Sequence, residues 1–375
     1  MSGSDGRLAQ MDGLRGLAAL VVVIFHFMSA FLPQLIPDQT DKPGIWADTP
    51  LGILFNGPFA VSVFFVLSGF VVSNAAAKRT TPVYVSMALR YVRLAVPVLF
   101  SVIFAWALLG LMPSATEALG GIIPHPWLQW TYQNEIPSLP AAILHGGLMV
   151  FVRGASYFDN VLWTMQIELV GSLIIYLVYG TMDGRLRTFT ILALGVLCCS
   201  TLVNPAYLGF VLGALMRDAW AEGRDGIAPS LVLIIGILLG FPGHGFSDRI
   251  GAGSISVIIM PGEQFSLVPP LAAAMIVYGV LYSRAGSLLE GRPVQFLGRI
   301  SFSLYLVHVP LLYTIFAMAY VRLRPDHSTL ALIFVGFIVL SLVTASLFEI
   351  LFDAPTLRFI AGAKTKMNSR AGQVA

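Results

Sequence analysis

Apolar segments close to the length of a membrane-spanning helix recur along the whole of this 375-residue chain. Only 11% of its residues are charged, against roughly 25% in a soluble domain. About 20 consecutive apolar residues cross a bilayer as a helix. The sequence therefore predicts an all-α, polytopic transmembrane helix bundle. We expect about ten helices, at residues 13–33, 57–77, 90–112, 160–181, 186–203, 205–217, 228–242, 266–282, 297–320 and 328–352.

Lys and Arg residues fall unequally on the two sides of such a bundle. With the N-terminus in the cytoplasm, 17 of the 22 lie on the cytoplasmic side, in accordance with the positive-inside rule. Both termini are therefore expected in the cytoplasm. Residues 1–360 are expected to form the membrane domain, and 361–375 a disordered basic tail. The five exceptions to the charge rule are Lys42, Arg153, Arg249, Arg322 and Arg324.

Other features of the chain exclude several classes of function. The net charge is only +3 and no basic run is present, which argues against a nucleic-acid partner. The two cysteines, Cys198 and Cys199, are adjacent within an apolar segment. Adjacent cysteines rarely pair with each other, so we expect no disulfide. The sequence also lacks a cysteine–histidine set with the spacing of a metal site, and we expect no metal.

The first apolar segment, MDGLRGLAALVVVIFHF, carries two ionisable residues on one helix face. Arg15 and His26 are eleven residues apart, which is close to three full turns and about 16 Å along a helix axis. With Arg15 at the cytoplasmic edge, His26 lies near the middle of the bilayer. An ionisable group at that depth is costly, and it is either satisfied by a neighbouring helix or part of a functional site.

Three further polar residues reach the same predicted depth from other helices. Ser68 lies in FFVLSGF, Glu168 in LWTMQIEL and His308 in SFSLYLVHVP, with Tyr305 one turn before His308. Their helices enter the membrane from opposite sides, yet counting residues from each predicted end brings all of them to the level of His26. Unrelated buried residues have no reason to share a level, so the functional interpretation is favoured.

A second cluster is predicted at the cytoplasmic edge. Arg90 and Arg93 are one turn apart at the start of an apolar helix, with Pro97 just beyond them, and Arg15 is at the same edge. The positive-inside rule alone explains Arg90 and Arg93 poorly, because these two residues are embedded in the start of an apolar helix. Paired guanidinium groups at this spacing suit a phosphate-bearing ligand.

The longest connection, residues 113–159, is predicted on the outer side and has two interpretations. It is rich in aromatic residues, namely Trp127, Trp130, Tyr132, Tyr157 and Phe158. Such residues form an interfacial belt around a surface loop, which is the favoured interpretation. The alternative is a surface on which a sugar stacks.

Taken together, these motifs resemble the membrane-bound acyltransferase-3 family, which O-acylates carbohydrates and other acceptors. The resemblance rests on five stretches that follow the family's order. They are DGLRGLAALVVVIFH with its Arg-x10-His spacing, FFVLSGF, the Arg-x-x-Arg-x-x-x-Pro stretch at 90–97, LWTMQIE and ISFSLYLVHVP. They span nearly the whole chain. Two departures are noted: Thr164-Met165 replaces the usual Ser/Thr-Leu, and the closing Glu-x-Pro is Asp353-Ala354-Pro355, so Asp353 is not counted as a site residue.

The resemblance implies an enzyme with an acyl-CoA donor, acetyl-CoA being favoured, that enters from the cytoplasm. It also implies that the first-helix histidine, His26, is the key catalytic residue. A neutral histidine can take the proton of an attacking hydroxyl. Glu168 is then expected to orient the imidazole, Ser68 to stabilise the oxyanion, and His308 to be the alternative base. The donor phosphates would bind Arg15, Arg90 and Arg93.

The predicted partners are therefore acyl-CoA, a carbohydrate or glycolipid acceptor and the lipid bilayer, with the bacterial inner membrane as the location. The rival hypothesis is a proton-coupled transporter of a small solute, because histidine and glutamate at the bilayer midplane also form proton relays. Inverted repeats typical of many transporters are not evident in the sequence.

Overall fold

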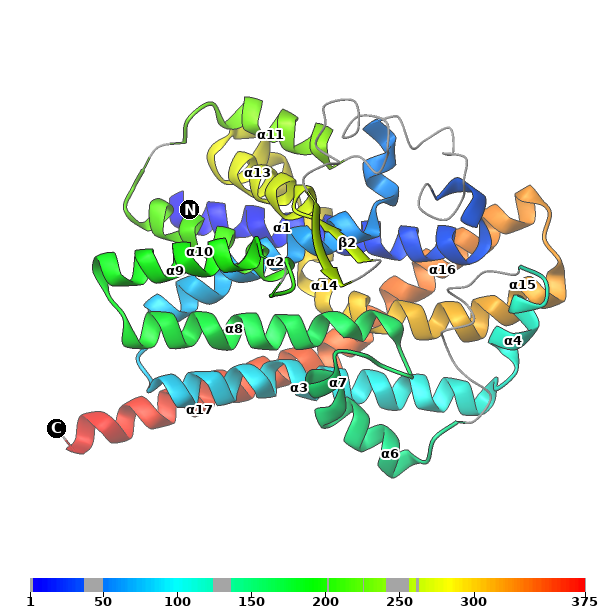
Figure 1. Ribbon diagram of the computed structural model, residues 1–375. Coiled ribbons are helices and arrows are strands. Elements are labelled where there is room, and N and C mark those ends of the chain that lie inside the picture. Colours follow the sequence, from blue (N-terminus) through cyan, green and yellow to red (C-terminus); the bar gives the residue numbers. More distant parts are fainter. Residues whose placement is uncertain are drawn as a thin grey trace. The chain divides into compact units, whose positions relative to one another are not determined.

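The computed structural model describes residues 3–36, 50–123, 136–200, 202–224, 226–240, 256–260 and 263–374. Within these ranges the chain is helical except for one short antiparallel hairpin, in which β1 (Ser256–Met260) pairs with β2 (Glu263–Ser266). Every one of the ten predicted segments coincides largely with a helix (Figure 1). The helical class predicted from the sequence is thus confirmed.

The helix lengths set how many of these segments are long enough to cross a membrane. Six are long and apolar enough, within the described residues. The pair formed by α13 (Val268–Tyr282) and the 3-10 helix Arg284–Glu290 is bent by 86° and adds a seventh only if it is one span. Three of the predicted spans correspond to helices of 15, 15 and 11 residues, which is why they fall short of that length. They are α9 (Gly184–Cys198), α10 (Tyr207–Ala221) and α11 (Pro229–Leu239).

The chain forms two compact units. Unit 1 comprises Met1–Phe25, Gln34–Met87 and Val170–Arg299, and unit 2 comprises His26–Pro33, Ala88–Leu169 and Ile300–Ala375. Four helices contribute residues to both units. They are α1 (Gly3–Phe31), α3 (Val83–Leu111), α8 (Trp163–Thr181) and α14 (Arg292–Leu311).

Unit 1 is built on close packing between α2 (Gly57–Ala77) and α10. A Cβ atom added at Gly69 would lie 2.3 Å from the Phe210 carbonyl oxygen, and one added at Gly213 would lie 2.2 Å from that of Val66. Neither position therefore has room for a larger residue, and the two backbones approach directly, as glycine permits between membrane helices. A buried cluster around Tyr179 and Ile191 extends this core to α8 and α9. Short 3-10 helices, Pro33–Leu35 and Pro50–Phe55, complete the unit.

Unit 2 contains the remaining helices and all three π-helical turns. The turns are His145–Met149, Leu312–Phe316 and Glu349–Asp353. Each inserts an extra residue into a helix, a feature found frequently at functional sites. The other elements of unit 2 are α4 (Ala115–Gly120), α6 (Leu139–Leu144), α7 (Val150–Arg153), the 3-10 helix Asn160–Leu162, α15 (Ala317–Leu323), α16 (His327–Phe348) and α17 (Ala354–Val374).

The connection at 113–159 is more regular than a surface loop. Its apolar part forms α6, a π-helical turn and α7, and Gly146 within that turn packs against α3, where an added Cβ would be 2.9 Å from Val102 Cβ. Tyr91 on α3 donates its hydroxyl hydrogen to the Gly147 carbonyl. Trp127, Trp130 and Tyr132, on which the stacking interpretation partly depends, lie outside the described residues.

The end of the chain is helical in the described residues. Residues predicted to be disordered from 361 onward continue α17 as far as Val374. Alanine, lysine, methionine and arginine, which favour helix, are frequent here, and proline is absent after Pro355. With α16 and the intervening π-helical turn, this segment forms one long helical rod (Figure 1).

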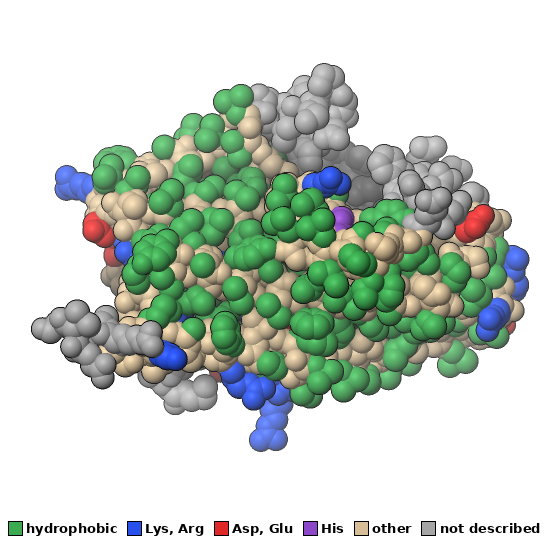
Figure 2. Space-filling view, turned by 90° about the horizontal axis from the view of Figure 1, so that it is seen from below, with side chains coloured by type: hydrophobic (Ala, Val, Ile, Leu, Met, Phe, Trp, Pro, Cys, Tyr) green, Lys and Arg blue, Asp and Glu red, His purple; other side chains and the backbone are tan. Residues whose placement is uncertain are grey.

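The exterior of the bundle has the character of a lipid-facing surface. On α16 the outward positions recur every three or four residues and are apolar and more than half exposed. They are Leu332, Val335, Val339, Val343 and Leu347. Figure 2 shows a face on which hydrophobic side chains predominate and charged ones are sparse. An exposed apolar surface of this extent is expected for an integral membrane protein.

Candidate active site

Two histidines form the centre of the site in unit 2. His26, near the end of α1, is 9% exposed, and His308, on α14, is fully buried. The Nε2 atom of His308 lies 3.0 Å from Nδ1 of His26, and the ring centroids are 5.0 Å apart. On its other side, His308 Nδ1 lies 3.0 Å from the Leu304 carbonyl oxygen.

These contacts fix which nitrogen of each neutral ring carries hydrogen. A carbonyl oxygen only accepts, so His308 Nδ1 must be the donor to Leu304. The Nε2 atom of a neutral His308 then has the lone pair and accepts from Nδ1–H of His26. His26 is left with its own lone pair on Nε2. Under this assignment Nε2 is the basic atom of the neutral His26 ring.

The helix around His308 is interrupted just after the histidine. Pro310 lacks a backbone N–H, so it cannot donate to the carbonyl of the preceding turn. One residue beyond Leu311 the chain enters the π-helical turn Leu312–Phe316, and Thr314 donates its hydroxyl to the Pro310 carbonyl at 2.6 Å. The sequence thus builds an irregular segment directly after the buried histidine.

A hydrogen-bonded contact joins α14 to the start of α8. Tyr305, one turn before His308, donates its hydroxyl to the Val161 carbonyl at 2.9 Å and lies 3.0 Å from Thr164 Oγ1. Its ring centroid is 6.0 Å from that of His308. Because Glu168 is one turn beyond Thr164 on α8, this contact fixes the spacing between the histidine pair and Glu168.

The paired arginines of α3 each bind a carboxylate. Arg90 donates to Glu168, and Arg93 forms a forked contact with Asp353, its second bond being 3.4 Å between Nη2 and Oδ2. The four side chains are 5–19% exposed. The Arg93 guanidinium also lies 5.1 Å from the centre of the Phe302 ring, in cation–π geometry. Each cation is therefore held in a fixed position by a charge-assisted contact.

The predicted site residues are divided between the two units. Unit 2 holds His26, His308, Glu168, Arg90 and Arg93; the His26 ring hydrogen-bonds to His308, whereas Glu168 binds Arg90. The sequence had placed Arg90 at the cytoplasmic edge and Glu168 at the level of His26. Their direct contact means that these two residues share one level.

The remaining predicted residues belong to unit 1. Arg15 forms an ion pair with Asp12 at 3.2 Å and donates to the Gly298 carbonyl. Ser68 is part-buried beside Gly69. The residue that sequence reasoning discounted is Asp353, because the family's closing glutamate was replaced by aspartate. The signal that could have identified it was its position two residues before a proline, where a carboxylate was expected.

Asp159, directly before the 3-10 helix Asn160–Leu162, is a buried acid that the sequence did not single out. Its side chain is fully buried, and Oδ1 accepts from the Val161 N–H at 3.2 Å. Its Oδ2 atom has no hydrogen-bond partner among the residues the structure describes. Burial raises the pKa of this carboxyl well above its ordinary value, and the hydrogen bond from Val161 opposes that shift.

Replacing Asp159 by asparagine should flatten the pH dependence of stability. Because the folded-state pKa is raised, the folded protein binds the proton more tightly than the unfolded chain does. Stability is then present below the ordinary carboxyl pKa of about 3.9 and is lost as pH rises toward the folded-state value. Asparagine keeps the acceptor for Val161 without a charge. Melting temperatures in detergent from pH 4 to pH 8 should therefore decline less steeply in Asp159→Asn than in the wild type.

A matched control for this experiment is the exposed acid Asp326, which caps α16. Hydrogen bonds from Thr329 lower the pKa of its carboxyl, so its contribution is lost as pH falls. Asp326→Asn should thus alter only the acid end of the profile. Identical slopes for the wild type and Asp159→Asn would contradict the assignment of a neutral buried Asp159.

The described ranges contain no group of three His, Cys, Asp or Glu side chains that could hold a metal ion. No solved structure matches the chain in a search of known structures.

Comparison with known proteins identifies the family. The profile of the acyltransferase-3 family, described as an acyltransferase domain, matches residues 8–350. An O-acetyltransferase, PaAT-1 of Phomopsis amygdali, is 25% identical over 358 residues, covering 81% of this chain and 72% of its own. The exopolysaccharide production protein ExoZ of Rhizobium meliloti (strain 1021) is 27% identical over 271 residues, covering 67% and 75% respectively. The chain therefore belongs to the acyltransferase-3 family and is an integral-membrane acyltransferase.

Proposed function

We propose that this enzyme transfers an acetyl group from acetyl-CoA to a hydroxyl of a carbohydrate or glycolipid acceptor. The observation that carries the proposal is the hydrogen-bonded pair of His26 and His308, which leaves a lone pair on His26 Nε2. The names of two relatives support the acceptor class. One is an O-acetyltransferase, and the other takes part in exopolysaccharide production.

The reaction begins when His26 Nε2 takes the proton of the acceptor hydroxyl. The hydroxyl oxygen attacks the thioester carbonyl and a tetrahedral oxyanion forms, which Ser68 is proposed to stabilise. Collapse of this intermediate breaks the carbon–sulfur bond, and the proton passes from the His26 imidazolium to the departing sulfur. The products are an O-acetyl ester and free coenzyme A.

His308 has the orienting role that a carboxylate has in a serine-protease triad. It accepts the Nδ1–H of His26, which holds the ring in the tautomer that exposes the lone pair of Nε2 to a proton donor. A neutral imidazole stabilises the charged ring less than a carboxylate would. Its main effect should therefore be on geometry and on the pKa of His26.

The donor phosphates are assigned to the arginines. A guanidinium has five N–H donors in one plane, more than a single carboxylate can accept. Arg90 and Arg93 can therefore bind Glu168 and Asp353 and still offer donors to phosphate oxygens. Arg15 is assigned the same ligand from its motif. Under this proposal Glu168 and Asp353 position the arginines.

A single experiment tests both the reaction and the orientation of the protein in a bacterial inner membrane. Vesicles of both orientations are prepared and supplied with labelled acetyl-CoA, which does not cross membranes, and the glycolipid fraction is analysed for label. Labelled acetyl groups should be transferred only in vesicles whose cytoplasmic face is outward. Equal transfer in right-side-out vesicles would contradict cytoplasmic entry, and the absence of ester-linked label in both preparations would contradict the acceptor class.

A further inference from the structure

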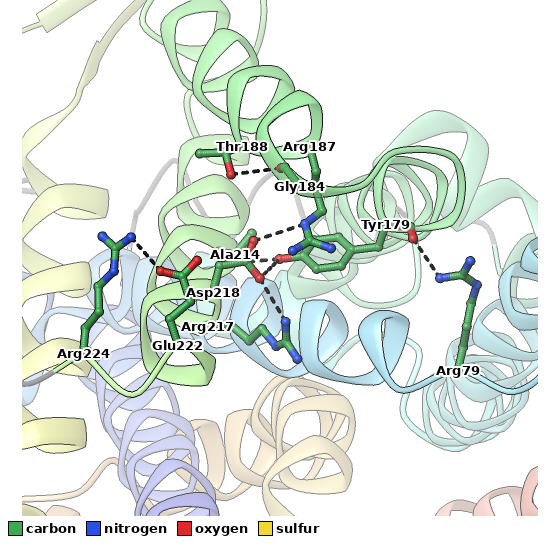
Figure 3. Close-up of polar contacts among 10 residues, drawn as sticks. All are labelled: Arg79, Tyr179, Gly184, Arg187, Thr188, Ala214, Arg217, Asp218, Glu222 and Arg224. Atoms are coloured by element: carbon green, nitrogen blue, oxygen red, sulfur yellow. Dashed lines mark hydrogen bonds and ion pairs between the residues drawn. The ribbon is translucent and has the colours of Figure 1, made fainter.

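A second polar cluster lies in unit 1 and has no part in the proposed reaction (Figure 3). Its centre is Asp218 on α10, which accepts hydrogen bonds from the Tyr179 hydroxyl at 2.8 Å and from Arg217 Nη1 at 2.9 Å. Arg187 on α9 approaches the same carboxylate, with Nε 3.3 Å from Oδ2. Both guanidinium groups lie over the Tyr179 ring, at 4.6 Å for Arg187 and 6.0 Å for Arg217.

The charges of this cluster do not balance. Two guanidinium groups share a single carboxylate, so one positive charge remains. Arg79 adds another cation beside the Tyr179 backbone, where it donates to the carbonyls of Ala76, Tyr179 and Gly180. Buried cations are costly unless they are paired. An anion bound at this cluster would therefore neutralise its excess positive charge.

The cluster also has hydrogen-bond donors in excess. Arg217 is 9% exposed, and its Nε atom is buried without a hydrogen bond to any part of the chain that the structure describes. An N–H left without an acceptor in a buried place costs free energy. An anion with several oxygens would satisfy both the charge and the donors.

The surface beside the cluster is apolar. Exposed side chains recur along one face of α9, starting next to Arg187 and continuing away from it. They are Leu186, Phe189, Leu192 and Val196, with exposures of 61%, 66%, 46% and 74%. A ligand bound here would meet guanidinium donors at one end and an apolar helix face at the other. That combination fits an amphiphile better than a free ion.

We propose that Arg187 and Arg217 bind the phosphate of an anionic phospholipid, whose acyl chains lie along α9. Basic pockets between membrane helices bind anionic headgroups in this way, and the forked guanidinium matches the geometry of phosphate oxygens. Arg185, Arg187, Arg217 and Arg224 all belong to the side predicted as cytoplasmic, where such lipids face the protein. The site is separate from the acyl-transfer reaction, and its test does not measure that reaction.

The test is the thermal stability of the full-length protein in detergent with added lipid. Phosphatidylglycerol should raise the melting temperature of the wild type in a concentration-dependent manner. Phosphatidylcholine with the same acyl chains should raise it much less. The variant Arg187→Gln should bind phosphatidylglycerol at least about tenfold more weakly, because it loses a charge-assisted contact.

Arg224→Gln is the matched control. It removes the same charge from unit 1, but the Arg224 side chain is 70% exposed and forms an ion pair with Glu222. Its response to lipid should equal that of the wild type. An undiminished response in Arg187→Gln, or equal responses to the two lipids, would overturn the proposal. Inorganic phosphate that stabilises as strongly as phosphatidylglycerol would overturn the assignment to a lipid.

A second measurement covers the case in which Arg187→Gln does not fold. Arg187→Lys keeps the ion pair with Asp218 but loses the fork, so the protein should remain folded while its lipid binding weakens severalfold. Phosphatidylglycerol that co-purifies with wild type and variant can be counted by mass spectrometry. Equal amounts of bound lipid would argue against the site.

Discussion

Replacing His26 by alanine should lower turnover by about 10²- to 10⁴-fold, the usual contribution of a general base, while the protein still folds and binds the donor. His26 lies near the end of α1 and hydrogen-bonds to His308. The arginines assigned to the donor are held by Glu168 and Asp353. Loss of the imidazole should therefore remove the base without releasing them.

The role of His308 is tested in the same series. If it positions His26, His308→Gln should reduce turnover less than His26→Ala and should shift the apparent pKa in the pH–rate profile. The double variant should be little worse than His26→Ala, because residues that act as a unit are not additive. Turnover must be expressed per folded molecule. Wild-type turnover in His26→Ala would show that His26 is not the general base, and His308 would then be the candidate for that role.

Replacing Arg93 by alanine should affect two quantities, stability and donor affinity, for different reasons. Asp353 is 4% exposed, so the substitution leaves a buried carboxylate without its partner, at a cost of up to about 3–5 kcal/mol. Loss of a charge-assisted contact to a phosphate should weaken acetyl-CoA binding by roughly ten- to hundredfold. Thermal melting and calorimetry with acetyl-CoA measure the two effects separately.

The double variant Arg93→Ala/Asp353→Ala separates the two explanations. Removal of both charges eliminates the stranded carboxylate, and stability should recover toward that of the wild type. Donor affinity should remain low, because the phosphate ligand is still missing. Recovery of both quantities together would mean that Arg93 serves only to hold α3 against the segment that contains Asp353.

The helices could be predicted because a bilayer leaves few alternatives to a sequence this apolar. A backbone in lipid must satisfy its own hydrogen bonds, so a long apolar run is a helix. Segment 139–153 was not predicted as helical because it is short and is stabilised by packing of Gly146 on α3. Its structure therefore depends on a contact between segments about 40 residues apart, which hydropathy does not detect.

The position of Arg90 shows why residue counting has limits in the site. The hydropathy pattern predicts a helix that begins at residue 90, whereas α3 begins at Val83. Seven residues of helix correspond to roughly 10 Å, so Arg90 lies two turns inside the helix and reaches Glu168. The polar start of α3 is still helical, and a hydropathy boundary does not mark where a helix begins. The shared level of His26 and His308 could be predicted, because it required only a count of residues along the two helices that carry them.

The π-helical turn Glu349–Asp353 makes the alignment of this region sensitive to length. A π turn holds one residue more than the α-helical turn in the same place, and such turns correspond to single-residue insertions. Because the turn absorbs this extra residue locally, deleting one residue here would regularise the rod of α16 and α17 and leave Asp353 able to reach Arg93. A relative one residue shorter in this interval would therefore align its carboxylate with Asp353 only through a one-residue gap, and a comparison of sequences without gaps would miss it.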